Sequence, residues 1–172
     1  QTFDGDVPFD TPKPSTLVAR MLDVATENEA GDIVLDFFAG SGTTAHAVLG
    51  QNLRDSGNRR FILVQLPEPT ERTDYRTIAD IAKERIRRVG KKIREENPLF
   101  AGDVGFRVFR LDTSNIRAWE PDRGALEESL FDASEHIKPD RTEQDILFEL
   151  LLKLGLDLCV PIQPKTIAGR TV

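Results

Sequence analysis

Hydrophobic positions in the first part of the chain change between helical stripes and short continuous runs. From Ser15, apolar residues recur on one helical face until Asn28 and Gly31 stop the pattern, so this segment predicts a helix. Residues 33–38 (IVLDFF) and 61–66 (FILVQL) are short apolar runs, which are typical of buried strands in a parallel sheet. The helical spacing of residues 43–53 places a second helix between them. Strand, glycine-rich turn, helix and strand make a βαβ unit, whose two strands we expect to lie parallel and adjacent.

The remaining elements are predicted from the same two periods. A stripe of Ile, Ala and Val predicts a long amphipathic helix over residues 73–96. Residues 105–111 (GFRVFRL) alternate between apolar and basic, which predicts a third strand, either at the edge of the sheet or buried on one side only. Two more helices are expected, one near 124–137 and one over 142–154, and residues 166–172 indicate the beginning of a hairpin or strand. The sequence therefore predicts an α/β protein with a partial parallel sheet and a helical C-terminal part.

Length and composition limit the class of protein. The chain has 172 residues and a formal net charge of −6, which suits one soluble domain and argues weakly against nucleic acid as a partner. No apolar run approaches the roughly 18 residues of a membrane span, so we expect no membrane association. The single cysteine, Cys159, excludes an internal disulfide and favours a cytoplasmic location. With only two histidines beside it, no metal site is expected.

One segment departs from the acidic average. Residues 83–94 contain seven basic residues and one acid, Glu84, so seven minus one leaves a local charge of +6. Such a stripe indicates either contact with DNA phosphates or a solvated helix face whose long side chains cover apolar surface. We favour the solvated face.

The most informative segment is DFFAGSGTT, residues 36–44, which joins the first strand to the second helix. Glycines at such a turn let a ligand approach the backbone, and the helix N-terminus offers free N–H groups. The pattern G-x-G-x-x-A also fits a dinucleotide site, but the second strand ends in Gln65 and not in an acid that would hold a ribose. Asp36 would repel a pyrophosphate and attract a cationic ligand such as S-adenosylmethionine. No G-K-[ST] follows, which excludes a P-loop. The charges favour S-adenosylmethionine over NAD.

These residues carry a resemblance to a known family. The segment DFFAGSGTT closely resembles the S-adenosylmethionine motif of the amino-methyltransferases that modify adenine or cytosine in DNA. Upstream, TPKP (11–14) resembles the family's other cofactor segment. Downstream, QLPE (65–68), IAKERI (81–86) and GFRVFRLDTSN (105–115) resemble the modification (Mod) subunit of type III restriction–modification systems. The resemblance implies a Rossmann-like methyltransferase half-domain over residues 1–112, followed by a mainly helical extension over 113–172.

The resemblance also implies the cofactor-binding residues. The strand end and glycine loop would hold the methionine part of S-adenosylmethionine, and Lys13 with Ser15 or Thr16 would lie near its carboxylate. Gln65 would take the ribose position that usually holds an acid, with Glu68 as the second candidate. The residues of the strand end and loop are Asp36, Phe37, Phe38, Ala39, Gly40, Ser41, Gly42 and Thr43.

The family's catalytic tetrapeptide, of the type D/N-P-P-Y/F, does not occur in this sequence. In the class that the segment order resembles, this motif and the DNA-recognition region precede the cofactor segment. We therefore expect the chain to be the C-terminal, cofactor-binding fragment of a DNA adenine N6-methyltransferase. Such a fragment would be inactive alone and would have no catalytic residues of its own. The implied partners are DNA, the missing N-terminal half, a second copy and a restriction subunit. The alternative is a non-catalytic Rossmann-like module that mediates subunit assembly. An NAD-dependent oxidoreductase fragment is disfavoured by Gln65 and Asp36.

Other residues are expected to have structural roles. His46 is expected at the surface, Cys159 is expected to be a small buried residue, and Tyr75 and Trp119 are expected to pack. The helix over 142–154 is apolar on more than one face, which indicates either burial against a partner or a central core helix.

Overall fold

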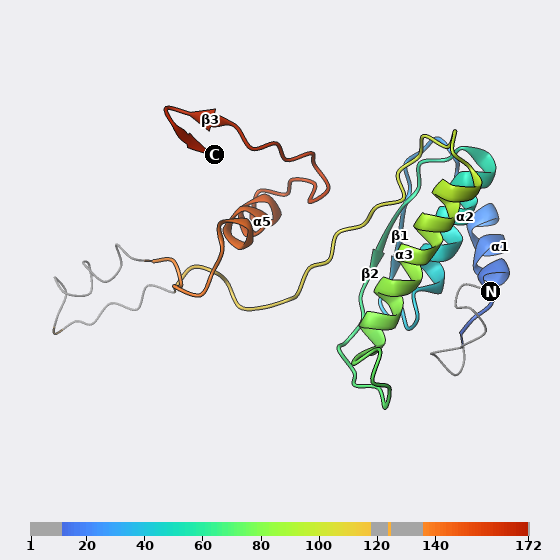
Figure 1. Ribbon diagram of the computed structural model, residues 1–172, viewed down its shortest axis with the longest axis horizontal. Coiled ribbons are helices and arrows are strands. Elements are labelled where there is room, and N and C mark those ends of the chain that lie inside the picture. The colour runs from blue at the N-terminus through green and yellow to red at the C-terminus, as the bar shows by residue number, and fades with distance from the viewer. Residues whose placement is uncertain (1–11, 118–123, 125–135, 172) are drawn as a thin grey trace. The chain divides into compact units, whose positions relative to one another are not determined.

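The computed structural model describes residues 12–117, 124 and 136–171. The chain divides into two units, residues 1–106 and residues 107–172. Unit 1 carries the βαβ segment and unit 2 the C-terminal helix (Figure 1). No helix among the described residues combines the length and the apolar character that crossing a membrane requires. The helix expected near 124–137 and Trp119 lie outside the described residues, apart from Gly124 and the last two positions of that range.

Two parallel strands and three helices make up the described part of unit 1. β1 pairs with β2 in parallel register, with Val34 opposite Phe61 and Asp36 opposite Leu63. The predicted βαβ unit and the adjacency of its strands are therefore confirmed. In chain order, the elements are α1 (Ser15–Ala25), β1 (Ile33–Asp36), α2 (Thr43–Asp55), β2 (Arg60–Leu63) and α3 (Ile78–Glu96).

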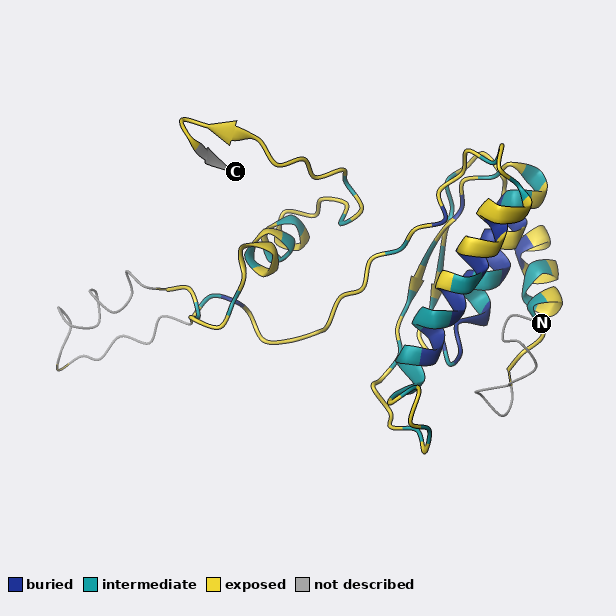
Figure 2. Cartoon of the chain, viewed as in Figure 1, coloured by how far each residue is buried: buried dark blue, intermediate teal, exposed yellow. Residues whose placement is uncertain are grey.

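Helix α2 is central in unit 1, because it packs against α1, α3 and both strands. In Figure 1 the three helices lie to one side of the strand pair. Apolar residues that recur on the inner face of α2 are buried there together with residues of α3 and with Leu22 of α1, as the dark blue ribbon of Figure 2 shows. The core residues of the helices are Leu22, Ala45, Ala47, Val48, Leu49, Ile81, Ala82, Ile86, Val89 and Ile93.

Among the residues that the structure describes, helices cover the two strands on one face only. Val34, Phe61 and Leu63 point toward the helices and pack against the core. The alternate residues are Ile33, Leu35, Ile62 and Val64, which are 45–52% exposed. A parallel sheet normally has helices on both faces, so an apolar outer face on this pair is unusual. We call the surface formed by these four residues the open sheet face.

Helix α3 begins at Ile78, five residues later than the sequence pattern predicted. Thr77 is its N-cap: the Thr77 hydroxyl accepts a hydrogen bond from the Asp80 N–H, and the Asp80 carboxylate accepts from the Thr77 N–H. The residues before it form a turn in which Pro69 and Thr77 make an isolated β-bridge. This capping box satisfies the first N–H groups and fixes where the helix starts.

The predictions for residues 105–111 and for Cys159 are wrong. Residues 105–111 form no strand, and within the described part of the chain no strand pairs with them. The Arg107 guanidinium instead donates hydrogen bonds to the backbone carbonyls of Leu158 and Val160 within unit 2. Cys159 is exposed and not buried.

Unit 2 contains α5 (Glu143–Lys153) and a short antiparallel pair, β3 (Thr166–Ile167) and β4 (Arg170–Thr171). The predicted capping box at the start of α5 is present, with Thr142 and Asp145 bonded reciprocally. The predicted terminal hairpin is also present. No residue of α5 is buried, so the interpretation as a central core helix is wrong for the described structure.

Candidate functional site: the glycine loop

The loop between β1 and α2 has a backbone that two glycines make possible. Gly40 and Gly42 have φ angles of 51° and 76°, in the left-handed region that residues with a side chain rarely adopt. Gly42 is the N-cap of α2 and lies against Ala82 of α3, where an added Cβ would meet the Ala82 Cβ and carbonyl oxygen at 3.3 Å. Glycine offers no side-chain cap, so the first N–H groups of α2 have no cap from that position.

Asp36 ties the two ends of the loop together. Its carboxylate accepts a hydrogen bond of 3.0 Å from the Phe38 N–H and one of 2.6 Å from the Thr44 hydroxyl. A carboxylate has about four acceptor positions. These two bonds therefore leave acceptor capacity on Asp36 for a ligand cation.

Gln65, just beyond the end of β2, holds the loop from a second side. Its amide oxygen accepts a hydrogen bond of 2.8 Å from the Gly40 N–H, and its amide nitrogen donates to the Glu68 carboxylate at 3.3 Å. Glu68 is exposed. Gln65 therefore uses one acceptor position to hold the loop. Its amide nitrogen also orients the solvent-exposed carboxylate of Glu68.

Arg85 of α3 holds the loop from a third side. Its guanidinium donates hydrogen bonds of 2.8 Å to the hydroxyls of Ser41 and Thr43. Arg85 is only 8% exposed, and burial lowers its pKa. Ser41 and Thr43 are also buried. The prediction that Arg85 belongs to a solvated helix face is therefore wrong.

His46 lies one turn into α2 and is half-buried, not a surface residue as expected. Its Nδ1 is 3.4 Å from the Arg85 Nε and accepts its hydrogen bond. Burial and then the charge of Arg85 lower the pKa of His46 to about 4. His46 is therefore neutral at pH 7, as an acceptor beside a guanidinium must be.

The remaining predicted site residues lie in three places. Ser15 and Thr16 line a cavity of about 140 Å³ between α1 and α2, whose other walls include His46 and Gln51. Lys13 is exposed, and among the described residues no hydrogen bond or ion pair joins it to the glycine loop. Beside the loop, Phe37 and Phe38 are 63% and 91% exposed, whereas Ala39 is buried.

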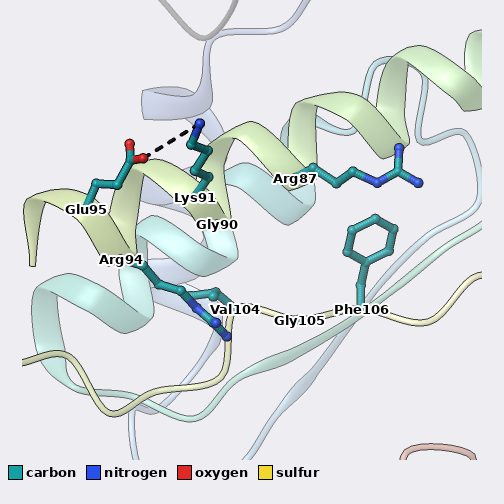
Figure 3. A pocket seen from close by; sticks show the side chains of 8 residues that line it. All are labelled: Arg87, Gly90, Lys91, Arg94, Glu95, Val104, Gly105 and Phe106. Carbon is teal, nitrogen blue, oxygen red and sulfur yellow. Dashed lines mark ion pairs between the residues drawn. The ribbon is translucent and has the colours of Figure 1, made fainter. Parts of the chain in front are cut away.

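A larger cavity, of about 480 Å³, lies away from the glycine loop between α3 and residues 104–106 (Figure 3). Val104 and Phe106 form its apolar side. The guanidinium carbon of Arg87 lies over the Phe106 ring, 5.9 Å from the ring centroid. The other α3 residues that line it are Gly90, Lys91, Arg94 and Glu95.

The basic stripe on α3 is largely balanced within the helix. Glu84 pairs with both Arg87 and Arg88, and Glu95 and Glu96 pair with Lys91 and Lys92. Lys83 pairs with Asp80. The burial of Arg85 removes one positive charge from the surface, and the pairs offset most of the others. Both observations favour a solvated helix face over a surface that contacts DNA.

A family model is the first comparison that shows what the chain is similar to. The family model for DNA methylases (N6_N4_Mtase) matches residues 4–86, which include α1, the glycine loop and α3 as far as Ile86. The resemblance to DNA amino-methyltransferases is therefore confirmed.

Individual proteins show which members of this class the chain is similar to. The chain is 44% identical over 115 residues to the type III restriction–modification enzyme StyLTI Mod subunit of Salmonella typhimurium, covering 63% of this chain and 17% of that protein. It is 41% identical over 135 residues to the type III restriction–modification enzyme EcoP15I Mod subunit of Escherichia coli, and the match covers 75% of this chain and 18% of that protein. It is 38% identical over 88 residues to the type II methyltransferase M.KpnI of Klebsiella pneumoniae, and the match covers 48% of this chain and 21% of that protein. The similarity to Mod subunits is confirmed, and the chain spans about a fifth or less of these relatives.

Sequence reasoning missed Arg85 although its signal was present. Arg85 lies four residues after Ile81 and four before Val89, on the row of α3 that faces the core. Residues four apart share a helix face, so an arginine in that row is expected to be buried.

Proposed function

We propose that this chain is the S-adenosylmethionine-binding part of a site-specific DNA adenine N6-methyltransferase of a type III restriction–modification system. The observation that carries the proposal is the glycine loop, which Asp36, Gln65 and Arg85 hold at the N-terminus of α2. The match to the DNA methylase family model supports DNA as the partner, and the resemblance to Mod subunits implies adenine as the target base.

The residues present fit this cofactor. The N-terminus of α2 suits the cofactor carboxylate, and the remaining acceptor capacity of Asp36 suits its ammonium group. Glu68 suits the ribose hydroxyls, since its carboxylate is exposed and oriented by Gln65. Phe38 offers an exposed apolar ring for the adenine. S-adenosylmethionine would supply a methyl group on its sulfonium for transfer to the exocyclic amine of the target base.

We further propose that the chain is one portion of a larger methyltransferase domain. The open sheet face supports this, because an apolar face of a parallel sheet requires a second layer. The short share of each relative that the chain covers and the lack of a D/N-P-P-Y/F tetrapeptide in the sequence support it too. Residues 1–112 would then form a Rossmann-like half-domain that binds the cofactor, and residues 113–172 an extension available for contacts with other subunits.

Titration calorimetry tests the binding proposal. The 172-residue chain should bind S-adenosylmethionine and not NAD, and Glu68→Gln should weaken binding because a carboxylate that accepts from two ribose hydroxyls is lost. Glu71→Gln is the matched control, since Glu71 is also exposed and lies three residues further along. Equal affinities for the two variants would exclude Glu68 from the site.

An assay of methyl transfer to DNA tests the functional proposal. The full-length protein should transfer the methyl group to adenine, whereas the 172-residue chain alone should not. Turnover by the chain alone would show that its own residues complete the site. The alternative, a ligand-free assembly module, predicts that neither protein binds S-adenosylmethionine.

A further inference from the structure

Arg85 is a buried cation, and in the described part of the chain no buried anion lies beside it. Its hydrogen-bond partners are the hydroxyls of Ser41 and Thr43 and the Nδ1 of His46. Among the described residues no carboxylate forms an ion pair with it, and burial alone accounts for its lowered pKa. Three uncharged acceptors from one short segment therefore satisfy the guanidinium.

This arrangement is costly for a purely structural contact. Removing a charge from water costs several kcal/mol after relaxation, and apolar residues of similar volume often replace buried charges without loss of stability. The position lies on the row of α3 between Ile81 and Val89, where an apolar residue would pack. A guanidinium does what an apolar side chain cannot, because its fixed fork binds two acceptors in one defined geometry.

The two hydroxyls that Arg85 binds belong to the residues on either side of Gly42. Glycine reaches left-handed and right-handed conformations about equally. Gly42 by itself therefore does not fix the φ of 76° that it has here. Fixing both neighbours fixes the peptide planes around Gly42. The directions of the first N–H groups of α2 depend on those planes.

We propose that Arg85 is a positioning residue that holds the glycine loop in the conformation that binds the cofactor, acting through Ser41 and Thr43. The inference rests on the proposed function, because it names the residue that preorganises that binding site. Arg85 does not touch the cofactor in this scheme. Its contribution is to remove the cost of ordering the loop when the cofactor binds.

Steady-state kinetics of the full-length protein test the inference. Arg85→Met should raise the KM for S-adenosylmethionine about tenfold or more, the factor expected when hydrogen bonds to a charged group are lost. The turnover number and the KM for DNA should stay within about twofold, since the loss concerns cofactor binding only. Arg85→Lys should recover only part, because an ammonium cannot reproduce the two-pronged geometry. Arg94→Met, an exposed position on the same helix, is the matched control.

A double-mutant cycle separates positioning from general packing. Thr43→Val keeps the side-chain shape and removes the acceptor, whereas Thr43→Ser keeps the hydroxyl. If Arg85 acts through Thr43, then Arg85→Met combined with Thr43→Val should raise the KM little more than the stronger single variant. Thr43→Ser keeps the acceptor, so it should raise the KM for S-adenosylmethionine less than Thr43→Val does. If Arg85→Met does not fold, the two Thr43 variants still test the contact.

The outcomes distinguish the inference from the proposed function. If the unmodified full-length protein neither binds S-adenosylmethionine nor methylates DNA, the proposed function fails. If it does both, and Arg85→Met has an unchanged KM for the cofactor or Thr43→Val matches Thr43→Ser, the positioning role is refuted. Equal effects on both KM values and on turnover would also refute it, because they indicate general damage.

Discussion

Gly42→Ala, at the N-cap of α2, should destabilise unit 1. At φ 76° an alanine costs about 1–2 kcal/mol relative to an allowed conformation. The new Cβ would also meet Ala82 at 3.3 Å, and the Ala82 carbonyl is backbone that cannot turn aside. The more restricted unfolded chain returns about 0.4–1 kcal/mol. We therefore expect the free energy of unfolding to fall by about 1–2 kcal/mol.

Gly50→Ala is the matched control, because Gly50 lies in the same helix with no atom within 4 Å of its added Cβ. Replacing a glycine in a helix interior by alanine should raise the free energy of unfolding by about 0.5–1 kcal/mol. Urea unfolding of the 172-residue chain, followed by circular dichroism, measures both changes. The free energies of unfolding of the two variants should differ by about 1.5–3 kcal/mol, the sum of the loss at Gly42 and the gain at Gly50. If Gly42→Ala were as stable as Gly50→Ala, both the assigned backbone conformation and the contact with Ala82 would be wrong.

Three further predictions concern unit 1. Asn52→Ala should lower the free energy of unfolding by about 2–3 kcal/mol in urea melts, since the buried Asn52 amide bonds both the N–H and the carbonyl of Arg59; a loss below about 0.5 kcal/mol would contradict this. Thr77→Ala should cost about 1 kcal/mol by removing the cap bonded to Asp80, and Thr77→Ser should cost much less. The pKa of His46 is about 4 when folded and ordinarily 6.5, so the unfolded chain binds the proton more readily. Stability should therefore fall as pH drops from about 6.5 to about 4, and His46→Gln should remove part of that slope in pH-dependent urea titrations.

The βαβ unit could be predicted because its signals are local. The apolar runs of β1 and β2, the glycines between them and the stripe of α2 each identify their own element within a few residues. The same holds for α1 and for the capping box of α5, where Thr142 and Asp145 are three positions apart. Similarity to DNA methylases followed from one nine-residue segment, DFFAGSGTT.

The features that were missed depend on distant partners. Residues 105–111 alternate like a strand, but a strand forms only where another strand pairs with it, and alternation alone carries no such information. Arg85 was assigned to solvent because charge was counted along the sequence instead of around the helix. Cys159 was expected to be buried from its residue type, yet in unit 2 the helix α5 itself has no buried residue.

The glycine loop has a consequence for motif transfer between proteins. Its side-chain supports come from the end of β1, from beyond β2 and from the middle of α3, so they span residues 36–85. A nine-residue graft of DFFAGSGTT into another α/β scaffold would bring Asp36 and leave Gln65 and Arg85 behind. Such a graft would reproduce the signature by which the family is detected while lacking two of the three groups that shape it. Designs that borrow this loop should therefore transplant the segment together with an arginine on the facing helix and an amide acceptor after the neighbouring strand.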